Sequence, residues 1–150
     1  MNQTLKTKIF SFIKNLIIIA VLIFVSTFIE IYWAMNSLSK RMSSGNPDSS
    51  FFDDVYFISV FTTIILTILF LLFTLIKKAY LKITIELICL ILVWFFWNYS
   101  IFVDRESSWS TYLFREEILH TLFLSFFPIL VLSLVMVFSL HYISKKYESK

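Results

Sequence analysis

Four long apolar segments limit what this chain can fold into. They cover approximately residues 12–33, 55–76, 83–103 and 118–143, and each reaches the roughly 20 residues that a helix needs to cross a bilayer. Hydrocarbon offers no partners to backbone groups, so a spanning segment must be a helix or part of a closed barrel. These segments are too long for barrel strands and show no polar–apolar alternation. The sequence therefore predicts an all-α, polytopic membrane protein with a four-transmembrane-helix bundle.

Composition supports a single transmembrane domain over residues 1–150. Of the 150 residues, 59% are apolar and only 15% are charged, whereas soluble domains carry about 25% charged residues. A small soluble domain has too little interior to hide so much apolar surface. The connections between the four segments are too short for a soluble domain, so lipid is the expected solvent.

The basic residues predict the orientation of the chain. Nine lysines flank the segments on one side and four basic residues lie on the other. Since basic residues in short flanks favour the cytoplasm, both termini and the connection between the second and third segments are expected there. The first side holds Lys6, Lys8, Lys14, Lys77, Lys78, Lys82, Lys145, Lys146 and Lys150; the other holds Lys40, Arg41, Arg105 and Arg115.

Residues that could support catalysis or metal binding are sparse. His120 and His141 are the two histidines, and the helix between them would separate them by about 30 Å, too far to share a metal ion. Arg115 and His120 match the R-x4-H spacing of HEPN ribonucleases, but the predicted topology places them on the outer side, away from cytoplasmic RNA. We find no phosphate-binding loop, catalytic triad or zinc motif. The sequence predicts no enzyme activity, no cofactor, no metal site and no direct nucleic-acid binding.

Two acids lie within the apolar segments. Glu86 follows Lys82 by four residues, which predicts an ion pair on one helix face, with the Lys82 ammonium reaching toward the headgroups. An acid within a span is by default a functional hypothesis, although its shallow depth favours a structural role. Glu30 lies near the outer boundary of the first segment, where a structural role is also expected.

Hydroxyl side chains line one face of the second segment. Their spacing of 4, 4 and 7 residues predicts helix packing through hydrogen bonds to the same or a neighbouring helix, with a pore between subunits as the alternative. They are Ser59, Thr63, Thr67 and Thr74. In the fourth segment Pro128 should bend the helix, and Ser125 is close enough to help satisfy the carbonyl that loses its partner.

Aromatic residues gather toward the outer side. All four tryptophans, Trp33, Trp94, Trp97 and Trp109, fall in the outer half or its connections, as expected for an aromatic belt at the membrane surface. Trp109 and Tyr112 have helical spacing and predict a short interfacial helix. Together with Glu116 they form one possible contact surface for a partner; Lys77, Lys78 and Lys82 form another.

The plan of the whole chain resembles two groups of small bacterial membrane proteins. It has a basic start, four spans, a lysine-rich inner connection, acidic outer connections and a lysine-rich tail. This plan is similar to that of colicin A-type immunity proteins, which neutralise pore-forming bacteriocins, and of Kiwa-type antiphage membrane subunits. The resemblance concerns architecture and transfers no site residue.

The resemblance implies a non-enzymatic protein of the bacterial inner membrane that acts by binding. Its expected partners are the lipid bilayer, further copies of itself, and a protein. On the antiphage interpretation, which we favour, that protein is a cytosolic effector that the chain anchors while sensing envelope disturbance. On the immunity interpretation it is a membrane-inserting toxin. A small channel or carrier subunit is a third possibility, through the hydroxyl face and Glu86.

Overall fold

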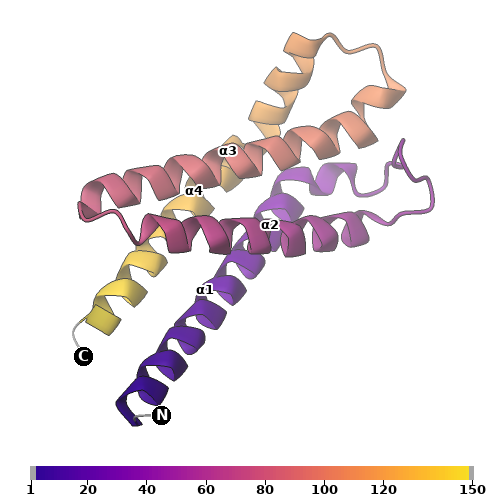
Figure 1. The fold of residues 1–150 in the computed structure, drawn as a ribbon. Coiled ribbons are helices and arrows are strands. Elements are labelled where there is room, and N and C mark those ends of the chain that lie inside the picture. The colour runs from indigo at the N-terminus through magenta and orange to yellow at the C-terminus, as the bar shows by residue number, and fades with distance from the viewer. Residues whose placement is uncertain (1–2, 149–150) are drawn as a thin grey trace.

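Residues 3–148, whose backbone the structure describes, form four long α-helices and two single turns of 3-10 helix. The structure, a computed structural model, describes the backbone of residues 3–148 and the side chains of residues 9–10 and 12–143. The described side chains do not include those of five lysines that were used to predict the orientation. These are Lys6, Lys8, Lys145, Lys146 and Lys150. The elements are α1 (Gln3–Met35), η1 (Asn36–Leu38), α2 (Phe51–Phe73), α3 (Ala79–Arg105), η2 (Ser107–Trp109) and α4 (Phe114–Glu148) (Figure 1).

The prediction of an all-α chain with four spanning helices is confirmed. Four helical segments are long and apolar enough to cross a membrane: Phe12–Leu38, Phe51–Phe73, Ala79–Trp109 and Phe114–Ile143. Most extend beyond the apolar segments because the helices continue through polar residues at their ends, but α2 ends at Phe73, three residues before the predicted end at Ile76, which lies in the connection to α3. Ser50, for example, starts α2 with a side-chain oxygen that accepts a hydrogen bond from the amide of Asp53, a common N-cap.

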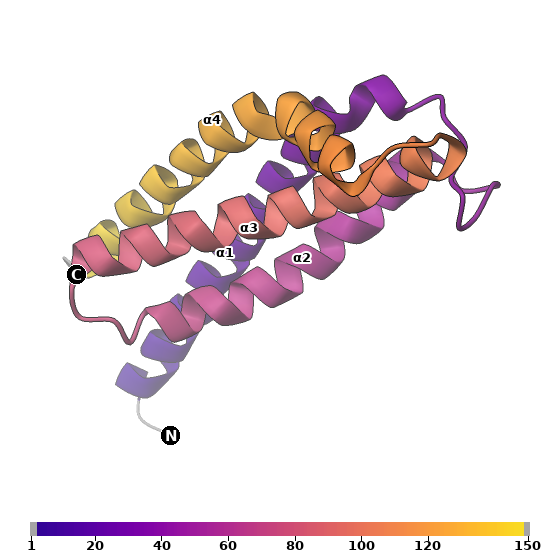
Figure 2. The ribbon, with the colours of Figure 1, turned by 90° about the horizontal axis from the view of Figure 1, so that it is seen from above.

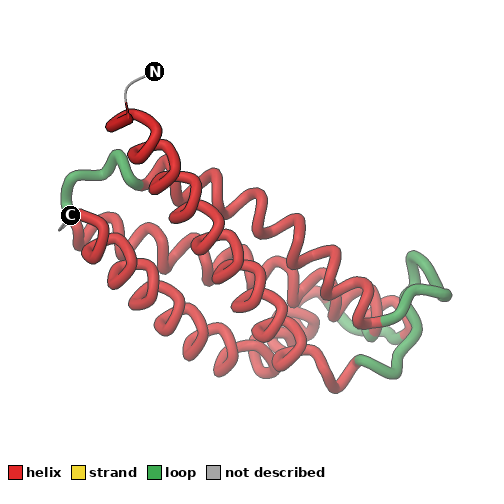
Figure 3. The backbone as a smooth tube through the Cα atoms, turned by 90° about the horizontal axis from the view of Figure 1, so that it is seen from below, coloured by secondary structure: helices red, strands yellow, loops and turns green. Residues whose placement is uncertain are grey.

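The helices alternate in direction. Both termini and the connection between α2 and α3 lie at one end of the molecule, which we call the hairpin end, and the two longer connections lie at the other, which we call the loop end (Figures 1 and 3). The most extensive contacts are those of α1 with α2 and of α3 with α4, followed by α1 with α4. The contact between α1 and α4 therefore brings the first and last helices together and completes the bundle.

Two clusters of buried apolar side chains form the core. One contains Leu66 of α2, Trp94 of α3 and Met136 of α4, and the other, nearer the loop end, contains Met35 of α1 and Phe102 of α3. Many large apolar side chains point outward instead, Phe123 being 85% exposed. Outward apolar surface of this extent is expected of helices surrounded by lipid.

Arg105 fastens the loop end. Its guanidinium is buried, forms an ion pair with Asp54, and donates hydrogen bonds to the carbonyl oxygens of Arg41 and Ser49. It also lies over the ring of Phe51 at 5.4 Å from the ring centroid. One side chain at the end of α3 thus holds the connection between α1 and α2 as well as the start of α2.

Two local predictions are wrong. Residues 107–109 form one turn of 3-10 helix and residues 110–113 are not helical, so no interfacial helix carries Trp109 and Tyr112. Instead the indole of Trp109 donates to the carbonyl of Met42 at 3.0 Å, which holds this connection against the one between α1 and α2.

The second wrong prediction concerns Ser125. Its hydroxyl donates to the carbonyl of Thr121, one turn earlier in α4, as serines in helices commonly do, and not to the carbonyl that loses its partner at Pro128.

The fourth helix changes direction along its course. In Figure 2 its N-terminal part is seen nearly end-on, whereas its C-terminal part runs across the view. Pro128 lies inside this helix, and a proline there lacks the amide hydrogen that would close the backbone bond one turn earlier. The change of direction agrees with the predicted bend, and it leads α4 back to the hairpin end.

Candidate functional site

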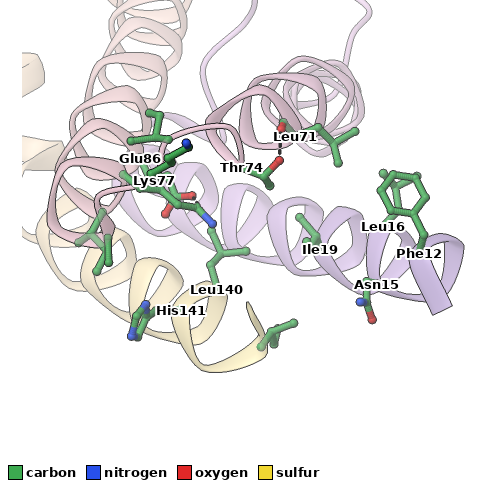
Figure 4. Close-up of a pocket in the computed structure, with 15 residues that line it drawn as sticks. Phe12, Asn15, Leu16, Ile19, Leu71, Thr74, Lys77, Glu86, Leu140 and His141 are labelled. Carbon is green, nitrogen blue, oxygen red and sulfur yellow. Dashed lines mark hydrogen bonds and ion pairs between the residues drawn. The ribbon is translucent and has the colours of Figure 1, made fainter. Parts of the chain in front are cut away.

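A groove between the helices at the hairpin end is the main candidate site. Its volume is about 620 Å³, and side chains from α1, α4 and the α2–α3 hairpin line it (Figure 4). Apolar residues such as Leu16, Leu71 and Leu140 form much of the wall, and Lys77, Lys82, Glu86 and other polar residues provide the remainder. An apolar cleft with a few convergent polar groups is the usual form of a binding site.

The charged part of this groove contains the predicted pair of Lys82 and Glu86. The Nζ of Lys82 lies 3.8 Å from Oε1 of Glu86, on the same face of α3, so the expected ion pair is confirmed. Glu86 is buried and Lys82 is partly buried. The neighbouring Lys77 adds a further positive charge to the lining of the groove.

Lys77 and Lys78 lie in the connection between α2 and α3, with exposed side chains. Neither forms an ion pair with any side chain that the structure describes. The structure therefore brings the predicted lysine set together at one end of the bundle, with Lys77 and Lys82 in the groove and Lys78 just outside it. Such lysines can meet an anionic group without first breaking an internal contact.

The outer set, Trp109, Tyr112 and Glu116, makes contacts within the protein, although Trp109 and Glu116 remain exposed. Trp109 donates to the carbonyl of Met42, Tyr112 packs against Phe102, and Glu116 accepts a hydrogen bond from the amide of Leu113 at the start of α4. These contacts give the three residues structural roles. The outer set is accordingly a weaker candidate for partner contact than the lysines.

The hydroxyl residues of α2 do not share one environment. Ser59 is buried and Thr74 is exposed, with Thr63 and Thr67 between them. The hydroxyls of Ser59, Thr63 and Thr74 donate to carbonyls of their own helix, which is one of the two predicted arrangements. The hydroxyl of Thr67 is buried and has no hydrogen-bond partner among the described residues, so three of the four hydroxyls are satisfied within their own helix.

A buried polar layer that the sequence analysis missed joins α1 to α3. Asn98 donates through Nδ2 to Oε1 of Glu30 at 2.8 Å, and the indole of Trp94 donates to Oγ1 of Thr27 at 3.0 Å. All four side chains are fully buried. Glu30 is therefore a core residue instead of a boundary residue, and Trp94 belongs to the core instead of an aromatic belt. The available signal was the presence of an acid and an amide within two apolar segments.

The histidines and acids that the structure describes do not gather into a metal-binding cluster. No group of three or more His, Cys, Asp or Glu side chains could hold a metal ion among them. The ring of His120 is stacked on Phe102 and meets Tyr112 edge-on at the loop end, whereas His141 lines the groove at the hairpin end. The histidine of the R-x4-H spacing therefore packs among aromatic rings.

Fold and groove together define a class: a four-helix, multi-pass membrane protein with a basic, partly apolar groove at one end. Comparison with known proteins does not narrow this class, since no family model matches the chain and no curated protein or solved structure matches it significantly. A proposal for the function must therefore rest on the groove and on the plan of the chain.

Proposed function

We propose that this chain is a non-enzymatic protein of the bacterial inner membrane that anchors a cytosolic partner at the groove of the hairpin end. The observation that carries this proposal is the groove itself, where three elements supply an apolar wall and lysines supply a positive rim. The partner segment that fits this chemistry is amphipathic and acidic, with apolar side chains against Leu16 and Leu71. Complementary charge of this kind favours the rate and specificity of association.

The orientation is part of the proposal. The excess of lysine on the hairpin-end side favours a cytoplasmic hairpin end, which makes the groove accessible to a soluble protein. In a Cys89→Ala background, cysteines at Asp48 and Ser108, both exposed at the loop end, should react with a membrane-impermeant thiol reagent in intact cells. A cysteine at Ala79 should react only after the membrane is opened. Labelling of Ala79 in intact cells would reverse the orientation.

Charge reversal at the rim tests the anchoring. The test uses cells of the source organism and extraction in mild detergent. The Lys77→Glu, Lys78→Glu double variant should retain about tenfold less partner protein than wild type does, because each reversal places a negative charge against the acidic partner. The matched control is Lys40→Glu with Arg41→Glu, since both residues are exposed at the loop end. Equal retention by wild type and the rim variant, or equal loss in the control, would contradict docking at the groove.

The biological setting that we propose is antiphage defence, in which the anchored protein is an effector and the bundle senses disturbance of the envelope. The plan of basic termini, basic hairpin and acidic outer connections supports it by its resemblance to Kiwa-type subunits. Cells that carry the intact system should survive a phage challenge, and survival should fall with the rim variant more than with the loop-end control.

An immunity function is the second candidate, and the outer surface of α4 favours it. Phe123, Phe126 and Phe127 are all exposed and present an aromatic ridge to the bilayer, where a pore-forming toxin would insert its helices. If the chain neutralises such a toxin, Phe123→Ala and Phe126→Ala should reduce protection against it while the rim variant protects normally. That order of effects is the reverse of the one expected for an anchor.

A further inference from the structure

The layer formed by Glu30 and Asn98 leaves two buried polar atoms unsatisfied. Oε2 of Glu30 and Oδ1 of Asn98 have no hydrogen-bond partner, although Oε1 of Glu30 and the amide nitrogen of Asn98 are bonded to each other. Both unsatisfied atoms are acceptors when the carboxyl is ionised. A buried carboxylate with a single hydrogen bond is strongly disfavoured, and so is a buried carbonyl with none.

One proton on Glu30 gives both unsatisfied oxygens a hydrogen-bond partner. A carboxylic acid has an acceptor and a donor side by side, and so does the amide of Asn98. With the proton on Oε2, Glu30 donates to Oδ1 of Asn98 while it continues to accept from Nδ2, which closes a ring of two hydrogen bonds between α1 and α3. The charge disappears in the same step.

No other described group takes the place of that proton. The charged and titratable residues on the elements around this layer have contacts elsewhere: Arg105 of α3 pairs with Asp54 of α2, Tyr32 of α1 stacks on Phe28, and His120 of α4 stacks on Phe102. None of these contacts includes Glu30. The hydroxyl oxygen of Thr27 accepts from the indole of Trp94, and no described hydroxyl donates to Oε2 of Glu30.

A bound metal cation fits the site less well than a proton. Hard cations take about six oxygen ligands, whereas the layer offers two unsatisfied acceptors. Among the described residues, no cluster of acids, histidines or cysteines forms a metal site. A water molecule could donate to both acceptors but would leave the carboxylate charge buried, whereas a proton also removes that charge.

We propose that Glu30 and Asn98 form a proton-binding site inside the bundle, in which the protonated Glu30 joins α1 to α3. This inference is independent of the groove and goes beyond the proposed anchoring. Removal of the proton to solvent leaves a buried carboxylate beside the Asn98 carbonyl, so the contact between Glu30 and Asn98 weakens, while the hydrogen bond from Trp94 to Thr27 remains.

Infrared spectroscopy of the purified protein in lipid tests the site directly. Wild type at neutral pH should show the carbonyl band of a protonated carboxylic acid, shifted by exchange into D2O and lost in Glu30→Gln. Glu86→Gln is the matched control, since it removes the other acid of the apolar segments and should leave the band in place. Absence of the band from wild type, or its persistence in Glu30→Gln, would overturn the proposal.

Stability against pH supplies a second measurement. Glutamine reproduces the donor and acceptor of the protonated acid, so Glu30→Gln should fold, and its midpoint of unfolding should stay constant where that of wild type falls with rising pH. If Glu30→Gln fails to fold, the band in wild type, its disappearance at high pH and its retention in Glu86→Gln still decide the matter. A wild type stabilised by sodium ions and not by lower pH would mean a cation site and would refute the proposal.

Discussion

Replacing Arg105 by methionine should lower the free energy of unfolding by about 3–5 kcal/mol, the range found when one partner of a buried ion pair is removed. The guanidinium is almost inaccessible, it pairs with Asp54, and it satisfies carbonyl oxygens of Arg41 and Ser49. Methionine fills much of the volume but leaves all three groups without their donor. Unfolding in mixed micelles, followed by loss of helical circular dichroism, would measure the change.

The matched control is Arg41→Met. Arg41 also pairs with an acid at the loop end, Glu106, at 3.2 Å, but its side chain is 57% exposed. Exposed pairs contribute only about 0–1 kcal/mol, so this variant should unfold nearly as wild type does. Similar losses in the two variants would show that burial does not distinguish the pairs, and that Arg105 does not fasten the loop end.

Hydropathy and charge were enough to predict the four helices, because a span must be long, apolar and internally hydrogen-bonded. The ion pair of Lys82 and Glu86 followed from spacing alone. Both inferences concern one helix at a time, and each depends on a rule of local geometry. The lysines of the candidate site were predicted on the same basis, since Lys77 and Lys78 lie in one short connection and Lys82 lies in the first turn of α3.

Which face of each helix meets the others could not be predicted in this way. In a soluble protein, the polar side of a helix marks the surface. Here Phe123 faces outward and Leu66 faces inward, and both are apolar, so the sequence gives no such contrast. The groove depends on this packing, because α1 and α4 form walls that only the folded bundle brings to the hairpin.

Glu30 and Trp94 show the same difficulty with polar groups. Each lies at a position along its helix where a membrane-surface role is common, and the packing of α1 against α3 decides that they are buried instead. Their hydrogen bonds join residues that are 67 and 68 positions apart in the sequence. The acid and the amide within two apolar segments indicate that each needs a partner, but a single sequence does not show that they pair with each other.

Truncating Trp94 to alanine should lower the free energy of unfolding by about 3–5 kcal/mol. The side chain is fully buried in the larger core cluster, so alanine leaves a cavity that the neighbouring helices cannot fill without moving. Trp94→Phe separates packing from hydrogen bonding: it keeps most of the ring and loses the bond to Thr27, and hydrogen bonds within membranes average roughly 0.6 kcal/mol.

Phe123→Ala is the control, because Phe123 is 85% exposed and lipid can occupy the vacated space. The expected order of destabilisation in mixed micelles is Trp94→Ala, then Trp94→Phe, then Phe123→Ala. A Trp94→Ala protein as stable as Phe123→Ala would place Trp94 at the lipid boundary, in agreement with the aromatic-belt interpretation of the sequence.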